Sequence, residues 1–137
     1  MIEYAVIGKF KLANQDQISA WIAFVLDEEA KELGEINYIF CDDDYLLEIN
    51  VKTLKHNTLT DIISFDYSLG NIVSGDVYVS YERVRDNAEN LDIVFVDELH
   101  RVMIHGILHY CGYKDKSDDE KILMRSKEDY YLSLRTF

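Results

Sequence analysis

The chain has 137 residues, of which 48% are hydrophobic and 29% charged, a composition that excludes disorder and predicts one globular domain over residues 1–137. It has two cysteines and no long apolar run, so we expect neither a disulfide scaffold nor a membrane-spanning helix, and we expect a cytoplasmic protein. The formal net charge of −12 argues, at face value, against nucleic acid as a partner.

The first half of the chain predicts a strand over residues 3–7 and a helix over 15–33, whose apolar side chains recur at helical spacing. Asn14 is the expected N-cap of this helix, with Gln17 three residues later, and Gly34 stands where a C′ glycine is expected. A β-rich strand follows over 36–41. Asp42 then caps a helix that runs to about residue 54.

The second half predicts two strands, 61–67 and 75–81, and the short loop 68–74 favours an antiparallel pair. Ser80 caps a helix over 82–90, and a further helix over 95–110 ends at Gly112. Ser117 and Glu120 form a capping-box pattern that opens a last helix, to about residue 134. The expected fold class is α+β: a small mixed four-stranded sheet with one antiparallel strand, covered by about five helices.

The helix over 95–110 carries a histidine pair at a spacing suited to metal binding. His105 and His109 are four residues apart, so both imidazoles lie on one helical face. Gly112 allows a left-handed backbone that turns the chain and can return Asp115 to the same ion. Two imidazoles and one carboxylate predict a site for one divalent metal ion, with Zn²⁺ as the expected ion and one position open for water. A histidine pair alone also occurs on helices without a metal, and it is the added glycine and carboxylate that sharpen the pattern.

The neighbours of the histidine pair leave alternatives open. Gly106 stands where the zinc-peptidase pattern His-Glu-x-x-His has its general base, so a peptidase mechanism needs a base from elsewhere. This glycine serves either tight helix packing or room for a ligand beside the metal. Glu98 lies on the same helical face, seven residues before His105, and is either a partner of that histidine or a solvated acid in the first turn.

The negative charge is concentrated in one part of the sequence. Residues 27–48 hold nine acidic residues and one lysine, and so account for −8 of the net charge of −12. Whether this charge repels an anionic partner therefore depends on the face that the segment occupies.

Several segments together resemble one known family. The pattern His-Gly-x-Leu-His-x-x-Gly-Tyr at 105–113, followed by a metal-ligating residue, resembles the YbeY family of bacterial ribosomal RNA maturation endoribonucleases. The segments TDIISF at 60–65 and GDVYVS at 75–80 resemble two strands of that family, and Glu98-Leu99 and Met124 also fall at expected places. The resemblance extends over residues 36–124.

The resemblance implies a zincin-like, metal-dependent hydrolase that cleaves single-stranded RNA. It implies a role in 16S ribosomal RNA 3′-end maturation and in ribosome quality control, so the expected partners are ribosomal RNA and the ribosome, with no membrane and no DNA. Carried over residue by residue, His105, His109 and Asp115 become the metal ligands. Thr60, Asp61 and Ser64 are candidates for substrate binding, although Asp61 can also accept a ligand histidine's N–H or tie down a turn.

The chain departs from the family pattern at two positions. The family motif usually ends in Asp-His, whereas this chain has Lys114-Asp115. An aspartate still coordinates zinc, but its added negative charge makes a bound water less acidic and favours harder ions. Leu54 stands where many members have an arginine, which leaves Lys55 and His56 as the nearest cations for a phosphate, or as exposed loop residues. The candidates for a catalytic role are thus Lys55, His56 and Glu98.

Two other functions fit parts of the pattern. A metallopeptidase fits the helix-turn spacing of the histidines but lacks the motif glutamate. A non-catalytic ribosome-assembly factor fits if its metal is structural, although structural zinc sites have four protein ligands and the sequence shows three.

Overall fold

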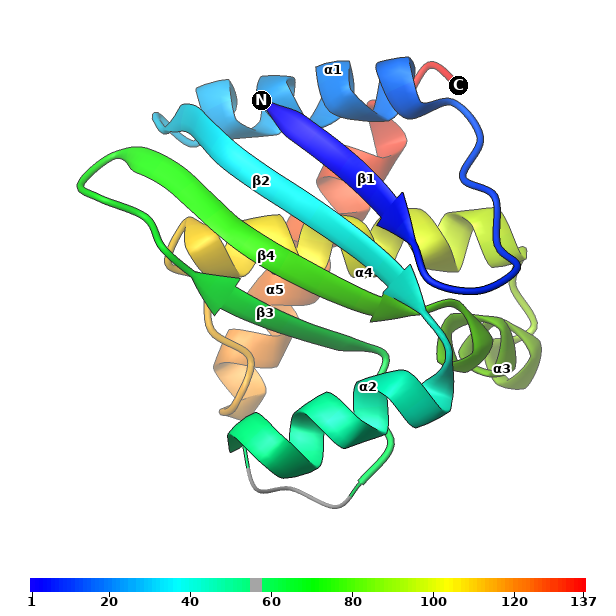
Figure 1. The fold of residues 1–137 in the computed structure, drawn as a ribbon. Helices are drawn as coiled ribbons and strands as arrows, with labels where there is room; N and C mark the ends of the chain where they lie inside the picture. Colours follow the sequence, from blue (N-terminus) through cyan, green and yellow to red (C-terminus); the bar gives the residue numbers. More distant parts are fainter. Residues whose placement is uncertain (55–57) are drawn as a thin grey trace.

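The strands form one mixed sheet in the order β1-β2-β4-β3 (Figure 1). The structure is a computed structural model that describes residues 1–54 and 58–137. Strands β1, β2 and β4 are mutually parallel, and β3 runs antiparallel to β4 at the edge of the sheet. The strand bounds are β1 Ile2–Val6, β2 Glu32–Cys41, β3 Ile62–Asp66 and β4 Ile72–Ser80. The expected mixed four-stranded sheet with one antiparallel strand is confirmed.

Five α-helices and one π-helical segment accompany the sheet in the described residues, again as expected for an α+β protein. Helix α4 is central, because it contacts strands β3 and β4 on one side and helices α1, α3 and α5 on others. Figure 1 shows α4 behind the sheet, α1 along its β1 side and α2 beside its β3 edge. The bounds are α1 Gln15–Glu28, α2 Asp43–Ile49, η1 Asn50–Leu54, α3 Tyr81–Leu91, α4 Phe95–Tyr110 and α5 Asp118–Ser133.

The hydrophobic core lies between the sheet and helices α1 and α4. Alternate residues of β2 and β4 are buried, and the parallel register places Tyr38 beside Val77 and Phe40 beside Val79. The Tyr38 hydroxyl donates to the Met103 carbonyl at 2.9 Å, which ties the sheet to α4. The Trp21 indole donates to the Tyr131 carbonyl at 2.9 Å and joins α1 to α5. The first contact holds α4 against the sheet, and the second holds α5 against α1.

The helix expected over residues 15–33 ends earlier, at Glu28, so that prediction is wrong at its C-terminus. Ala30, with φ 57°, takes the left-handed C′ position that Gly34 was expected to fill. The amides of Ala30 and Lys31 donate to the carbonyls of Asp27 and Leu26, which is the Schellman arrangement. The sequence did not reveal this helix end, because an alanine and not a glycine adopts the left-handed conformation. Leu33 and Gly34 belong to β2.

Most of the other helix starts are confirmed. The side chains of Asp42 and Ser80 accept the amides of Tyr45 and Arg83, as expected of N-caps. The Ser117–Glu120 capping box is present in full. Asn14 is the N-cap of α1, but its side chain makes no capping hydrogen bond, so the expected pairing with Gln17 does not form.

No helix in the described part of the chain combines the length and the apolar character that crossing a membrane requires.

Replacing a core isoleucine of α4 tests how far this packing sets stability. Ile107 is fully buried, so Ile107→Ala removes apolar contacts and leaves a cavity, and we expect a loss of about 2–5 kcal/mol in the free energy of unfolding. Ile122 on α5 is 69% exposed, and Ile122→Ala should change stability by no more than about 0.5 kcal/mol. Urea unfolding followed by circular dichroism measures both. Equal midpoints for the two variants would contradict the assignment of α4 to the core.

Candidate metal centre

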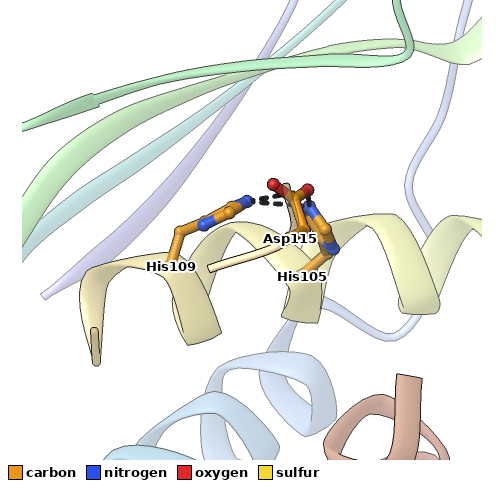
Figure 2. Close-up of side chains that lie close together, drawn as sticks. All are labelled: His105, His109 and Asp115. Carbon is orange, nitrogen blue, oxygen red and sulfur yellow. Dashed lines mark hydrogen bonds and ion pairs between the residues drawn. The ribbon is translucent and has the colours of Figure 1, made fainter. Parts of the chain in front are cut away.

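Three side chains converge at the C-terminal end of α4 (Figure 2). The Nε2 atoms of His105 and His109 lie 2.9 Å apart, and Asp115 Oδ2 lies 3.1 Å from the first and 3.3 Å from the second. Ligand atoms bound at 2.0–2.1 Å around one tetrahedral ion are themselves about 3.3 Å apart. The separations and the donor types, two imidazole nitrogens and a carboxylate oxygen, therefore fit a small divalent ion such as Zn²⁺.

The turn after α4 brings Asp115 to the histidines. Gly112, with φ 103°, donates its amide to the His109 carbonyl, and Tyr113 donates to the Leu108 carbonyl at 3.1 Å. This is a Schellman turn with glycine at C′, as the sequence predicts. The Tyr113 carbonyl in turn accepts the Nδ1–H of His109 at 2.9 Å. That hydrogen bond leaves His109 Nε2 with its lone pair toward Asp115, in the tautomer that a metal ligand needs.

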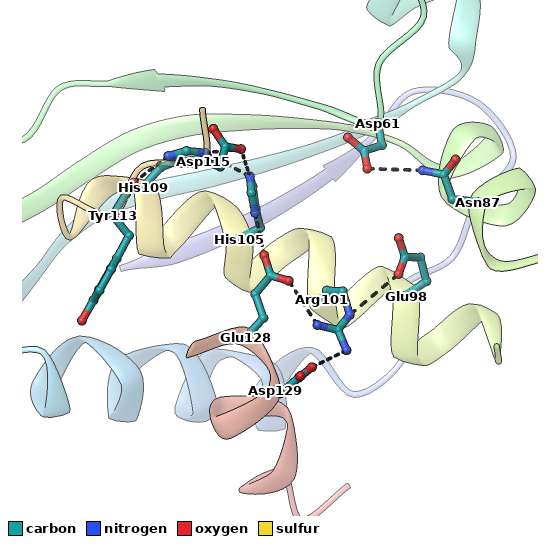
Figure 3. Close-up of polar contacts among 10 residues, drawn as sticks. All are labelled: Asp61, Asn87, Glu98, Arg101, His105, His109, Tyr113, Asp115, Glu128 and Asp129. Carbon is teal, nitrogen blue, oxygen red and sulfur yellow. Dashed lines mark hydrogen bonds and ion pairs between the residues drawn. The ribbon is translucent and has the colours of Figure 1, made fainter. Parts of the chain in front are cut away.

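His105 is oriented by Glu128 from helix α5 (Figure 3). Its Nδ1 lies 2.6 Å from Glu128 Oε2, and Glu128 is buried. Burial lowers the pKa of His105, but the hydrogen bond and charge of Glu128, together with the charges of Asp115 and Asp61, raise it overall. A carboxylate on the second imidazole nitrogen fixes the ring and makes Nε2 a stronger ligand.

The sequence did not identify Glu128 as this partner. Its place on α5, between the buried residues Met124 and Tyr131, is the signal that was available. A carboxylate within an apolar helical stripe needs a partner in the interior, because an unpaired buried charge is costly. Arg101 meets that need from the other side, donating from Nη1 to Glu128 Oε1 at 3.1 Å and from Nη2 to Asp129 at 2.7 Å.

Both interpretations of Glu98 are wrong. It is 5% exposed, so it is not a solvated acid, and it makes no contact with His105, whose Nδ1 is bonded to Glu128. Seven residues of helix separate Glu98 from His105 by about 10 Å along the axis, which is too far for direct contact. The pKa of Glu98 is raised, first by burial and then by the negative charge of Asp61.

The candidates Thr60 and Asp61 directly precede β3, and Asp61 lines the same cavity as His105 and Asp115. Asp61 accepts a long hydrogen bond from Asn87, 3.4 Å, and burial raises the pKa of its carboxyl. Since the Nδ1 atoms of both histidines have other partners, Asp61 is not their acceptor. The Thr60 hydroxyl donates to the Ile62 carbonyl at 3.3 Å, and Ser64 lies on β3. Substrate binding by Thr60, Asp61 and Ser64 stays a prediction.

Some predictions fall at or beyond the limits of the described chain. Lys55 and His56 lie outside the described residues, so their suggested role in phosphate binding stays untested. Leu54, which replaces the family arginine, is 46% exposed at the end of η1.

Gly106 is explained by packing, because a Cβ there would lie 3.1 Å from Ile62 Cδ1 and 3.3 Å from Val77. It faces the sheet, where a side chain would press on Ile62 and Val77.

A cavity of about 390 Å³ opens beside His105 and Asp115. Its lining comes from β3, α4, the turn and α5, and none of the nine acidic residues of the 27–48 segment is part of it. Arg101, Lys121 and Arg125 contribute positive charge to its walls. The concentrated negative charge of the sequence is therefore not directed into the space beside the metal centre.

Comparisons with known proteins agree on one family. The family model described as endoribonuclease YbeY matches residues 7–135. The chain is 57% identical to endoribonuclease YbeY of Flavobacterium psychrophilum, over 98% of this chain and 96% of the relative. It is 47% identical to the protein of the same name from Karelsulcia muelleri, over 96% and 94%. The solution structure of TM1509 from Thermotoga maritima matches with a TM-score of 0.68 at 25% identity, over 97% of this chain and 87% of that one.

The contact between Glu128 and His105 has a measurable consequence in the metal-free protein. Because the folded-state pKa of His105 is raised above its ordinary 6.5, the protonated ring stabilises the fold below that value, and this contribution disappears as pH rises through the raised pKa. Glu128→Gln should lower the pKa of His105, as measured by NMR titration of the imidazole. The stabilisation of the fold by the protonated ring should then be lost at a lower pH. Asp129→Asn, one residue along and paired with Arg101, serves as the control. An unchanged His105 pKa in Glu128→Gln would show that the carboxylate of Glu128 has no electrostatic effect on the imidazole.

Proposed function

Since this chain belongs to the family of endoribonuclease YbeY, we propose that it is an endoribonuclease that hydrolyses single-stranded RNA with one divalent metal ion held by His105, His109 and Asp115. The observation that carries the metal assignment is the convergence of the three ligand atoms within 3.3 Å of one another. Two imidazoles and one carboxylate favour Zn²⁺. When bound there, such an ion supplies an acidified water and stabilises negative charge on a phosphoryl oxygen.

The surrounding residues hold the ligand side chains in the orientation that a metal ion requires. Tyr113 and Glu128 hold the two imidazoles through their Nδ1 atoms, so that both Nε2 lone pairs face Asp115. Arg101 neutralises the buried Glu128 carboxylate, which would otherwise be isolated in the interior. Fixed ligands lose little entropy on binding, and this favours a site preorganised for chemistry.

The geometry favours hydrolysis of RNA over the two other functions. A peptidase of the His-Glu-x-x-His type needs a glutamate at position 106, but this chain has a glycine there, packed closely against Ile62 and Val77. A structural metal needs four protein ligands, and the ligand cluster in the described chain contains three, beside an open cavity. These features support a catalytic site with a free position.

The proposed substrate is ribosomal RNA, and the proposed task is maturation of the 16S 3′ end and ribosome quality control in the cytoplasm. Family membership supports this assignment. The local charge of the cavity is compatible with it, because Lys121 and Arg125 lie next to the metal centre and can contact phosphates.

Loss of a ligand should remove both the metal and the activity. His105→Ala removes one of the three ligands, and we expect metal affinity to fall by more than about 100-fold, beyond the 10–100-fold typical of an outer partner. Mass spectrometry of the purified protein measures bound metal, and a ribosomal RNA precursor assay measures cleavage. Unchanged metal content and unchanged cleavage in His105→Ala would refute the proposal.

A pair of aspartates close together in the sequence provides a matched control. Asp115→Asn replaces the carboxylate ligand with a weaker amide, and we expect it to lower both metal content and cleavage. Asp119 lies four residues later and is exposed on the first turn of α5, so Asp119→Asn should leave both unchanged. Equal losses in the two variants would point to a general effect of charge and not to a ligand.

A further inference from the structure

The cavity beside the metal centre combines apolar walls with buried acceptors. Val102 and Met124 are buried and lie in its lining together with Ile62. Glu98 and Asp61 add carboxylates, and Figure 3 shows both directed into the space above α4. Lys121 and Arg125, which are exposed, supply positive charge at its surface. This mixture differs from a channel that contacts only phosphates, because it places carboxylate acceptors among apolar side chains.

Glu98 is the unusual member of this lining. It is 5% exposed, and its Oε1 has no hydrogen-bond partner among the described residues. The nearest cation is Arg101, whose Nε lies 3.9 Å from Oε1, while its other two nitrogens bind Glu128 and Asp129. A buried carboxylate oxygen without a hydrogen bond costs stability, and donors that a ligand brings would satisfy it.

The position of Glu98 sets what part of a ligand it can reach. The helix places it about 10 Å along α4 from His105, too far to touch a phosphate at the metal centre. A nucleotide next to that phosphate can place its base in this cavity and turn its Watson–Crick edge toward Glu98. Single-stranded RNA is read in this way, with splayed bases stacked on side chains and bonded along their edges.

We infer that this cavity is a base-recognition subsite that takes a guanine adjacent to the scissile phosphate, with Glu98 as the acceptor of its Watson–Crick edge. Guanine alone among the four RNA bases presents two neighbouring N–H donors there, N1–H and the 2-amino group, and a carboxylate has two oxygens to accept them. Adenine and cytosine place an acceptor beside their amino donor, and uracil has a single donor. The inference rests on the proposed function, since it assigns a substrate preference to the same site.

Direct binding of mononucleotides tests the subsite without any cleavage. We expect guanosine 5′-monophosphate to bind the full-length protein about 5-fold to 150-fold more tightly than adenosine 5′-monophosphate, as measured by calorimetry, which is the range for one bidentate contact to a base. In Glu98→Gln the amide replaces one acceptor with a donor, and the preference should disappear. Glu89→Gln makes the same change at an exposed position of α3 and should keep the preference. Equal affinities, or no measurable binding, in the unaltered protein would overturn the inference.

Cleavage of designed RNA separates this inference from the proposed function. The substrates are single-stranded oligonucleotides of adenines with one guanine, and we expect cleavage to concentrate at a bond beside the guanine. The unaltered protein should show this bias, and Glu98→Gln should lose it. Cleavage without bias would overturn the guanine subsite and leave the endoribonuclease proposal standing. Absence of all cleavage, with a guanine preference in calorimetry, would refute the proposed function and still support the guanine subsite.

Discussion

The turn that ends α4 is the constraint on which the candidate metal centre depends. It requires a left-handed residue, and Gly112 provides one where a side chain would add about 1–2 kcal/mol of strain. The turn has two effects at once, because the Tyr113 carbonyl orients His109 and the chain beyond it delivers Asp115 to both imidazoles. Helical spacing alone brings the two histidines together, and the reversal of the chain adds the carboxylate.

Helix α4 can present these ligands accurately because it is held on several sides. Tyr38 fastens it to the sheet, and Gly106 allows it to approach Ile62 and Val77 closely. Helix α5 then supports the polar face of α4 through Glu128, which contacts both His105 and Arg101. A buried carboxylate bonded to an imidazole and a guanidinium is compensated, and breaking this group would leave an isolated charge in the interior.

The distribution of charge reconciles an acidic chain with an anionic substrate. The acidic segment 27–48 runs from the end of α1 through β2 into α2, and it contributes nothing to the lining of the cavity. Charges beyond a Debye length of about 8–10 Å are largely screened at physiological ionic strength, so the local groups matter most. Near the site these are the cations Arg101, Lys121 and Arg125, together with the carboxylates of Asp61, Glu98, Asp115 and Glu128.

Features that depend on neighbours along the chain could be predicted from the amino-acid sequence. These include the α+β class, the bounds of α4, the caps at Asp42, Ser80 and Ser117, and the spacing of His105 and His109. Prediction failed where a local signal was weak, as at Ala30, which adopts a conformation more typical of glycine. The hydrogen bond of His105 to Glu128, and not to Glu98, depends on the fold, because packing of α5 across α4 joins residues 23 apart in sequence. Capping and helical periodicity are local, whereas burial and the choice of partner are set by elements that meet only in the folded chain.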